Sequence, residues 1–257
     1  MRKILLAFAL AMLMNPLAAN AADKNPICTN TTEISNRTTI TGSPCVLPRS
    51  TSGTEVGYTN LTIDGLGNVT VDPQVNLRVG TFTKKVEVDL TLPSYVRSFK
   101  NRGTSDFIFG GKYAFYNTKR YALATRTSVE FPTAINGNGA SAWSYAGGVV
   151  GSYVASPALR LSASSDFQST ATAFNRYGAS REALAADLDV YKATHLTGGY
   201  GLQTNALGPN TNSRPTYQVG VTQGFGRKAS ADFALGRDFK KATGQDRYLS
   251  VGFTYLP

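Results

Sequence analysis

The amino-acid sequence predicts an all-β fold, a transmembrane antiparallel up-and-down β-barrel of about twelve strands in an exported protein. Three observations lead to this prediction. An apolar leader opens the chain, segments of alternating apolar and polar residues recur from residue 55 to the end, and short and longer connections alternate between them. Charged residues make up only 16% of the chain, against a usual ~25% in soluble domains.

The clearest alternation lies in residues 68–93. One parity is apolar and the other polar, with Val69, Val71, Val75, Leu77 and Val79 against Thr70, Asp72, Gln74, Asn76 and Arg78. After a break at Gly80-Thr81 the pattern resumes, with Val86, Val88, Leu90 and Leu92 against Lys85, Glu87, Asp89 and Thr91. Successive side chains of a strand point to opposite faces, so this stretch predicts two strands joined by a tight turn. In a membrane barrel the apolar face contacts lipid and the polar face lines the lumen. Pro73 lacks an N–H and predicts a bulge.

The N-terminus has the features of a secretory leader. Arg2 and Lys3 precede an apolar run over residues 4–14, and residues 19–21 form a small-x-small cleavage site. We therefore expect a signal peptide over residues 1–21. No later stretch reaches the ~18 apolar residues of a spanning helix, so membrane insertion is expected only as a barrel.

The chain has a formal net charge of +10, and loss of Arg2 and Lys3 with the leader leaves +8. This excess favours anionic partners. Nucleic acid is not expected for an exported protein. Outer-membrane lipid, lipopolysaccharide phosphates and anionic solutes are the expected partners.

Residues 22–54 form a separate N-terminal segment, rich in Thr, Asn, Ser and Pro and with little periodicity. Its two cysteines, Cys28 and Cys45, predict a disulfide because the protein is exported. A metal site is not expected, since the only histidine, His195, is distant in sequence, and no cofactor is expected either. The segment has two alternative positions, hanging in the periplasm or folding into the barrel as a plug.

Residues 55–257 are expected to form the barrel. The predicted strands cover residues 56–63, 68–79, 83–92, 106–115, 120–131, 143–154, 159–168, 181–191, 195–203, 216–222, 230–238 and 247–256. Longer connections are expected at residues 94–105, 132–141, 169–180, 205–214 and 239–246. Short periplasmic turns that alternate with longer outer loops are typical of bacterial barrels, and aromatic residues at strand ends predict girdles at the membrane interfaces.

The polar faces of the predicted strands bring many charges into the lumen. The lumen-lining candidates are Arg78, Lys85, Glu87, Asp89, Asp106, Lys112, Arg126, Glu130, Arg160, Asp166, Asp187 and Asp189. One interpretation is structural, because charges inside a barrel pair and hydrogen-bond across strands. The other is a charged constriction that selects a solute.

A second group of basic residues falls on the predicted outer loops. Its members are Arg97, Lys100, Arg102, Lys240 and Lys241. They indicate a rim that binds lipopolysaccharide phosphate or attracts anions, or simply a solvated basic rim.

The C-terminal sequence Gly252-Phe253-Thr254-Tyr255-Leu256-Pro257 is similar to the signal by which outer-membrane barrels engage the barrel assembly machinery. Pro257 stands where that signal has a terminal aromatic residue. An enzyme is not expected, because His195 has no serine partner nearby in sequence and no carboxylate pair has a specific spacing.

Several short motifs carry a family resemblance that covers roughly residues 55–257. They are Leu77-Arg78-Val79-Gly80, Val86-Glu87-Val88, Ser105-Asp106-Phe107 leading to Gly111-Lys112-Tyr113, and the strand ending Phe131-Pro132-Thr133. In this order they resemble the outer-membrane barrels of the MetA-pathway of phenol degradation family, although Ala134 stands where that family often has Gly. The resemblance implies an outer-membrane barrel that passes small, often hydrophobic or aromatic, molecules. It transfers no catalytic residues.

The sequence thus predicts a protein of the bacterial outer membrane with two alternative functions. The first is a narrow channel or transporter for small hydrophobic or aromatic solutes. The second is a non-conducting barrel with a structural or surface-interaction role. A barrel of about twelve strands lies between those with side-chain-filled interiors and the open porins, so a narrow path is expected rather than a wide pore.

Overall fold

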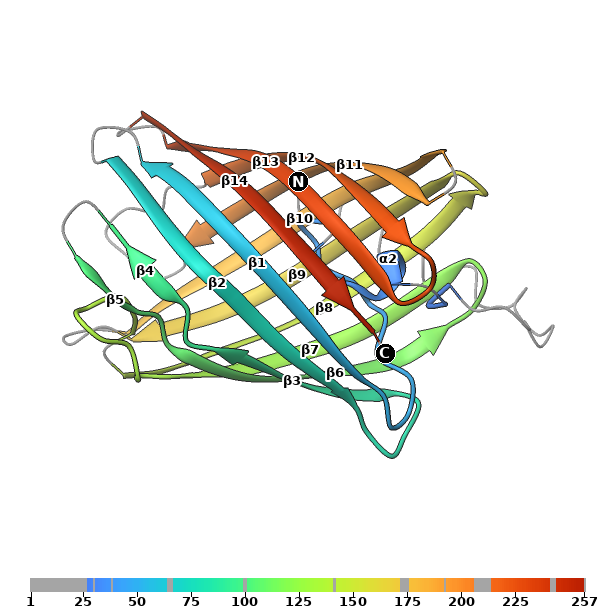
Figure 1. The fold of residues 1–257 in the computed structure, drawn as a ribbon, viewed down its shortest axis with the longest axis horizontal. Helices are drawn as coiled ribbons and strands as arrows, with labels where there is room; N and C mark the ends of the chain where they lie inside the picture. The colour runs from blue at the N-terminus through green and yellow to red at the C-terminus, as the bar shows by residue number, and fades with distance from the viewer. Residues whose placement is uncertain are drawn as a thin grey trace.

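In a computed structural model, the chain forms a closed antiparallel barrel of twelve strands (Figure 1). The structure describes residues 27–29, 31–37, 39–63, 67–98, 101–140, 142–171, 176–191, 193–205, 214–240 and 244–256. The predicted signal peptide lies outside these residues.

Fourteen strands and one short helix are present in the described parts of the chain. They are α2 (Thr31–Ile34), β1 (Ser52–Ile63), β2 (Gly67–Gly80), β3 (Val86–Leu92), β4 (Tyr95–Arg97), β5 (Arg102–Thr104), β6 (Phe107–Asn117), β7 (Tyr121–Phe131), β8 (Ala142–Ser156), β9 (Leu159–Ala171), β10 (Arg176–Tyr191), β11 (Thr194–Asn205), β12 (Arg214–Phe225), β13 (Ala229–Lys240) and β14 (Gly244–Tyr255). No described helix has the length and apolar character needed to cross a membrane.

Each barrel strand pairs with its neighbours in sequence, and β1 closes the barrel by pairing with β14 on one side and β2 on the other. The small strands β4 and β5 are an exception. They form a hairpin that continues the β2 edge beyond β3, because β2 pairs with β3 through one half of its length and with β4 through the other. The twelve-strand barrel predicted from the alternation is confirmed.

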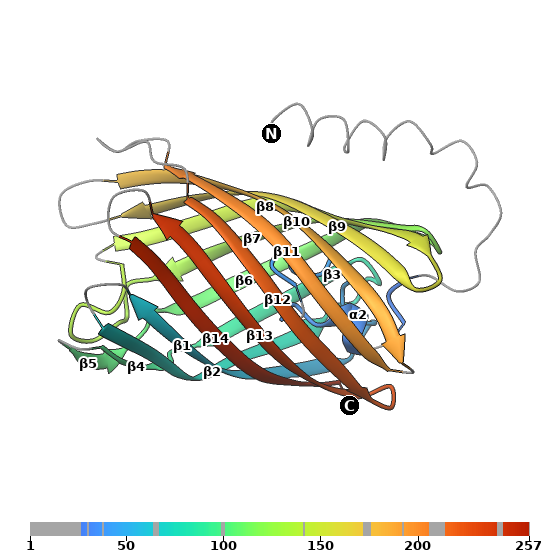
Figure 2. The ribbon, with the colours of Figure 1, turned by 90° about the horizontal axis from the view of Figure 1, so that it is seen from above.

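The two ends of the barrel differ (Figure 2). The β2–β3, β6–β7, β8–β9 and β12–β13 turns, α2 and the C-terminal end of β14 lie at one end, and the β4–β5 hairpin lies at the other. We refer to these as the short-turn end and the long-loop end.

The predicted bulge at Pro73 is present, and it changes which side chains enter the lumen. Gly57 of β1 pairs with Gln74 and Thr59 pairs with Val71, so two residues of β2 oppose one of β1. A single extra residue reverses the facing of everything beyond it. Val69 and Val71 therefore share the inner face with Gln74, Asn76 and Arg78, and the expectation of one continuous apolar face along β2 is wrong. Asp72 faces outward, where it pairs with Arg97.

Several strands are longer than the sequence pattern predicts. β9 ends at Ala171 and β10 begins at Arg176. In the same way, β13 ends at Lys240 and β14 begins at Gly244. Two connections expected to be long are therefore short. The strands continue past the segments of clear alternation because backbone pairing does not require an apolar face, so the alternation marks only part of each strand.

The outer wall is apolar and rich in aromatic rings. Large side chains that face outward are exposed on the isolated chain, among them Phe109, Tyr113, Trp143, Tyr145 and Phe253. Rings gather at strand ends, where Phe131 contacts Trp143 and Phe107, and Tyr121 stacks on Tyr153 with ring centroids 5.0 Å apart. This arrangement matches the predicted interfacial girdles.

The facing can be tested at Val219, in the middle of β12, whose side chain is 61% exposed on the isolated chain. Val219→Arg places a charge in the hydrocarbon region and should reduce the free energy of unfolding in vesicles by about 2–4 kcal/mol, so that the barrel is less stable. Val219→Leu, the matched control, should change it little. Denaturant titration of the protein in phospholipid vesicles measures both, and equal stability of the two variants would contradict the outward facing.

Candidate functional site

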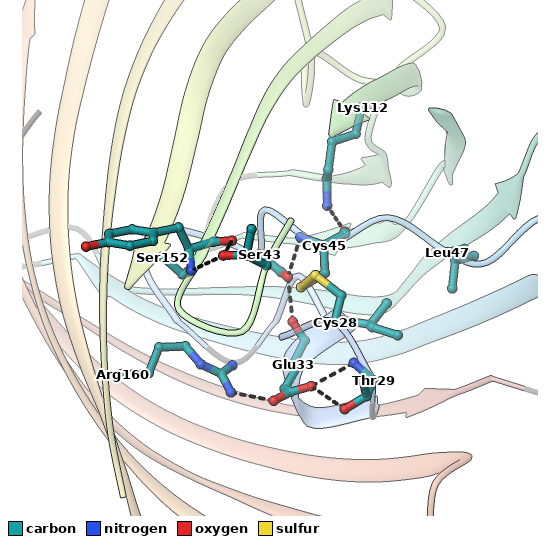
Figure 3. The surroundings of a disulfide bond; sticks show 12 residues. Cys28, Thr29, Glu33, Ser43, Cys45, Leu47, Lys112, Ser152 and Arg160 are labelled. Carbon is teal, nitrogen blue, oxygen red and sulfur yellow. Dashed lines mark hydrogen bonds and ion pairs between the residues drawn. A yellow bond between two sulfur atoms is a disulfide. The ribbon is translucent and has the colours of Figure 1, made fainter. Parts of the chain in front are cut away.

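The described part of residues 27–51, here called the inner segment, lies inside the barrel at its short-turn end (Figures 1 and 2). It contains α2 and the disulfide between Cys28 and Cys45, whose Cα atoms are 5.3 Å apart (Figure 3). The predicted disulfide is therefore present. At the first residue of the segment, the N–H of Ile27 donates to the Thr118 carbonyl of the β6–β7 turn.

A buried ion cluster joins the inner segment to the first three strands. Arg78 of β2 donates from Nε and Nη2 to the two carboxylate oxygens of Glu87 on β3, both at 2.8 Å. Its Nη1 donates to Glu55 of β1 at 2.7 Å and to the Ile34 carbonyl of α2 at 2.8 Å. Arg78 and Glu87 are fully buried and Glu55 is 3% exposed.

The carboxylates of this cluster also bind the backbone of the inner segment. Glu87 accepts the Leu47 N–H at 2.8 Å, and Glu55 accepts the Asn36 N–H at 2.9 Å. Lys112 of β6 adds a second cation. Its Nζ donates to the Asn36 side-chain oxygen at 2.8 Å and to the Cys45 carbonyl at 3.0 Å, and lies 4.0 Å from Glu87.

Two further arginines continue these contacts around the wall. Arg126 of β7 holds Asp166 of β9 through two hydrogen bonds and donates to the Thr41 carbonyl at 3.0 Å. Arg160 of β9 donates to Glu33 of α2 at 2.8 Å (Figure 3). The same Glu33 carboxylate accepts the Thr29 N–H, which ties the ion pair to the disulfide-bonded turn.

The inner segment itself supplies one cation to the wall. Arg37 donates to Asp232 of β13 at 3.2 Å and to the Ser250 hydroxyl and Val251 carbonyl of β14. Its guanidinium lies against Gly57 and Gly252, where a Cβ atom on either glycine would overlap it. These two inward positions therefore accommodate the arginine only because they carry no side chain.

A small apolar cluster also holds the inner segment against the wall. Ile34, Cys45 and Leu47 of the inner segment pack against Ala122 of β7 and against Leu256. On the side lined by Glu33, Ser43, Arg160 and Asp187, the space between segment and wall is a cavity of only about 10 Å³. A cavity of that size holds one water at most, so the segment fits closely against this part of the wall.

At the long-loop end, Asp106 holds a loop over the lumen. Its carboxylate accepts the backbone N–H groups of Thr133, Ala134 and Ala140, at 2.8, 2.7 and 2.5 Å. The loop of residues 132–140 also contacts the β4–β5 hairpin, since the Asn136 side chain donates to the Arg102 carbonyl. Two motifs noted in the sequence, Ser105-Asp106-Phe107 and Phe131-Pro132-Thr133, are thus bonded partners.

Between the inner segment and this loop lies a cavity of about 360 Å³. It extends from Arg37 to the loop residue Asn138. Its wall includes Asn76, Thr91, Asp106, Glu130, Val71 and Ile108. Val71 enters the lumen because of the bulge at Pro73. The volume is in the range of small-molecule binding pockets.

Charged residues of β10 and β11 lie near the β10–β11 turn. Asp187 is buried, and Asp189 is 45% exposed. The His195 Nδ1 atom lies 2.5 Å from Asp189 and 4.0 Å from Asp187. No described cluster of three or more His, Cys, Asp or Glu side chains has the geometry of a metal site.

The structure places most of the lumen candidates on the inner face, with one correction. Lys85 is exposed in the β2–β3 turn, not in the lumen, because the hairpin closes between the Thr81 N–H and the Val86 carbonyl and residues 82–85 do not pair with β2. Asp89 lines a smaller cavity of about 150 Å³ with Arg126, Ser128 and Asp166.

Among the outer-loop candidates, Arg97 lies on β4 and pairs with Asp72 at 3.0 Å, and Arg102 is exposed on β5. Lys240 ends β13. Lys100 and Lys241 lie outside the described residues.

The partners that the inner segment supplies were not predicted from the sequence. The segment residues concerned lie in a stretch without periodicity, and they are Glu33, Asn36, Arg37 and Thr41. Glu55 of β1 was also not among the candidates. The signal that could have indicated them is the number of charged residues on the predicted lumen faces, because buried charges need polar partners.

The comparisons with known proteins agree with this architecture. The sequence matches the family described as "Putative MetA-pathway of phenol degradation" over residues 35–257. The chain belongs to this family. The match begins within the inner segment and includes all the barrel strands. No curated protein sequence matches the chain.

Solved outer-membrane barrels have the same fold. The COG4313 outer membrane channel from Pseudomonas putida F1 aligns with a TM-score of 0.66 and 16% identity, covering 84% of this chain and 98% of that one. The NanC porin aligns with a TM-score of 0.57 and 7% identity over 79% of this chain and 98% of its own. The KdgM porin aligns with a TM-score of 0.53 and 13% identity, covering 78% of this chain and 98% of that one. The protein is therefore a β-barrel of the bacterial outer membrane.

The buried ion cluster gives a direct test of how the inner segment is held. Glu87→Gln leaves Arg78 with an incomplete partner in a fully buried site, and removal of one member of such a pair costs about 3–5 kcal/mol. We expect a large loss of stability in denaturant titration. Glu182→Gln, the same change on β10 outside this cluster, serves as the control. A Glu87→Gln protein as stable as the control would contradict the cluster.

Proposed function

We propose that the protein is a narrow outer-membrane channel for small solutes, closed at its short-turn end by the inner segment. The observation that supports this proposal is the cavity of about 360 Å³ between the inner segment and the loop of residues 132–140. A barrel with only a mechanical role would not need such a space in its lumen.

The way in which the inner segment is held supports a removable closure. Hydrogen bonds and ion pairs join the segment to the wall. They are made by Arg78, Lys112, Arg126, Arg160 and the segment's own Arg37. Water can replace such bonds one by one, whereas an apolar core resists hydration. Movement of this segment would connect the cavity to the short-turn end.

The family membership supports solutes that are small and hydrophobic or aromatic, as expected from the sequence. Of the three solved structures reported above, the one from Pseudomonas putida F1 is a channel, and the other two are porins.

The second candidate is a non-conducting barrel, and the close fit of the inner segment favours it on one side of the lumen. In that case the exposed Arg102 would serve a surface interaction, with lipopolysaccharide phosphate as the expected partner. The expected engagement of the β14 end by the barrel assembly machinery applies to both candidates.

Planar-bilayer conductance distinguishes the two candidates. The mature protein should conduct weakly or not at all, and a variant without residues 22–49 should conduct steadily because the lumen is cleared. Arg37→Ala should raise the frequency of openings, since it removes the bonds to β13 and β14. Arg49→Ala, an exposed residue of the same segment, is the control and should behave like the unmodified protein.

The folded state of each variant is checked by heat-dependent gel mobility before recording. Silence of folded truncated protein, together with no solute uptake in liposome swelling, would exclude the channel and favour the structural role.

A further inference from the structure

The exposed surface at the short-turn end is strongly basic. Residues 48–51, which lead into β1, and the turns at residues 81–85, 118–120 and 226–228 carry exposed cationic side chains and no acidic residue. The cations, here called the basic arc, are Arg49, Lys84, Lys85, Lys119, Arg120, Arg227 and Lys228. Lys85, expected in the lumen from the alternation, is thus part of an external surface.

Backbone contacts place the basic arc on one continuous part of the rim. The β12–β13 turn is bonded to the end of β14, which pairs with β1. The Ser50 N–H donates to the Gly80 carbonyl at 3.1 Å, so Arg49 lies beside the β2–β3 turn (Figure 1). The Ala114 N–H donates to the Lys85 carbonyl at 2.8 Å, which joins that turn to β6 and the β6–β7 turn.

The rest of this rim is not uniformly basic. The β8–β9 turn, Pro157-Ala158, lies at the same end and carries no charge. The cations are therefore concentrated on the side of the barrel that runs from β12 through β1 to β7.

An exposed phenylalanine precedes the cations in each of the three basic turns. Phe82 in the β2–β3 turn is 86% exposed, and Phe115 and Phe225 are exposed near the ends of β6 and β12. Aromatic rings at the ends of barrel strands mark the level of the membrane interface. The cations follow these rings in the chain, within the turns, and so lie at the level of the lipid headgroups.

The chemistry of the basic arc distinguishes between headgroups. Bacterial barrels have their short turns in the periplasm, so the headgroups at this level belong to phospholipids of the periplasmic leaflet. A zwitterionic phosphatidylethanolamine carries an ammonium group beside its phosphate, whereas phosphatidylglycerol carries the phosphate charge alone. The arc offers N–H donors to a phosphate, and its turns contain no carboxylate that could accept from the ammonium group.

We propose that the basic arc binds the phosphate groups of anionic phospholipids in the periplasmic leaflet of the outer membrane. Lysine and arginine side chains hold the phosphate, and the acyl chains lie along the apolar outer wall beside Phe82 and Phe115. This interaction surface lies outside the lumen and is independent of whether the barrel conducts.

Competition between lipids tests the proposal on the unmodified mature protein in detergent. Phosphatidylglycerol and phosphatidylethanolamine with the same acyl chains are added in equal amounts, and native mass spectrometry measures the bound fraction of each. Phosphatidylglycerol should bind about tenfold more tightly or better, because several cations act on its net charge. Equal binding of the two lipids would overturn the proposal. Displacement of phosphatidylglycerol by an equal amount of sn-glycerol 3-phosphate would indicate a site for free phosphate and would overturn the lipid assignment.

Variants locate the binding surface. Lys84→Gln combined with Lys85→Gln should weaken phosphatidylglycerol binding about tenfold and change phosphatidylethanolamine binding less than about twofold. Lys84→Arg combined with Lys85→Arg should retain the preference. Arg97→Gln combined with Arg102→Gln removes the same charge from the long-loop end and is the matched control, which should bind both lipids like the unmodified protein.

Heat-dependent gel mobility confirms that each variant is folded before the measurement. A folded Lys84→Gln/Lys85→Gln protein that binds phosphatidylglycerol as before, or a control that loses the preference equally, would refute the basic arc as the binding surface.

Discussion

The ion pairs and hydrogen bonds of the buried Arg78 guanidinium are the interactions on which the rest of the lumen depends. An ion taken out of water loses several kcal/mol of solvation unless its partners replace the lost hydrogen bonds. Arg78 meets this requirement with three protein elements at once, since it bonds Glu87 on β3, Glu55 on β1 and the Ile34 carbonyl of α2. The first strands of the barrel and the inner segment therefore share one electrostatic unit. Lys112 extends it to β6, with its Nζ 4.0 Å from Glu87, so that two cations face the two carboxylates.

This constraint also explains why the inside of the barrel is built from small residues. The charged side chains must reach inward and still leave room for a second layer of chain. Ala122 and Ala124 lie fully buried under the inner segment, and Gly57 and Gly252 lie under Arg37. The large apolar side chains face outward instead, which is the reverse of a soluble protein. The membrane and the inner segment thus impose opposite size preferences on the two faces of each strand.

The fold was predictable because alternation is a local property. In each strand between Val86 and Phe253, the alternation of apolar and polar residues indicates which side chains face lipid. The prediction failed where one residue changed the register. Pro73 signalled a bulge, but the consequence, that Val69 and Val71 turn into the lumen, appears only in the pairing of β1 with β2. Lys85 was misplaced for a related reason, because the closing bond of the hairpin, not the alternation, decides where the turn begins.

The candidate site was less predictable than the fold, because the pairing of charges is not local. Arg126 and Asp166 are 40 residues apart in sequence, and Arg160 finds its partner 127 residues earlier at Glu33. The sequence shows that acids and bases enter the lumen but not which of them remain after pairing. That remainder decides what a lumen can bind. Most of the expected lumen charges are used to hold the barrel and its inner segment together, so the structural interpretation applies to them.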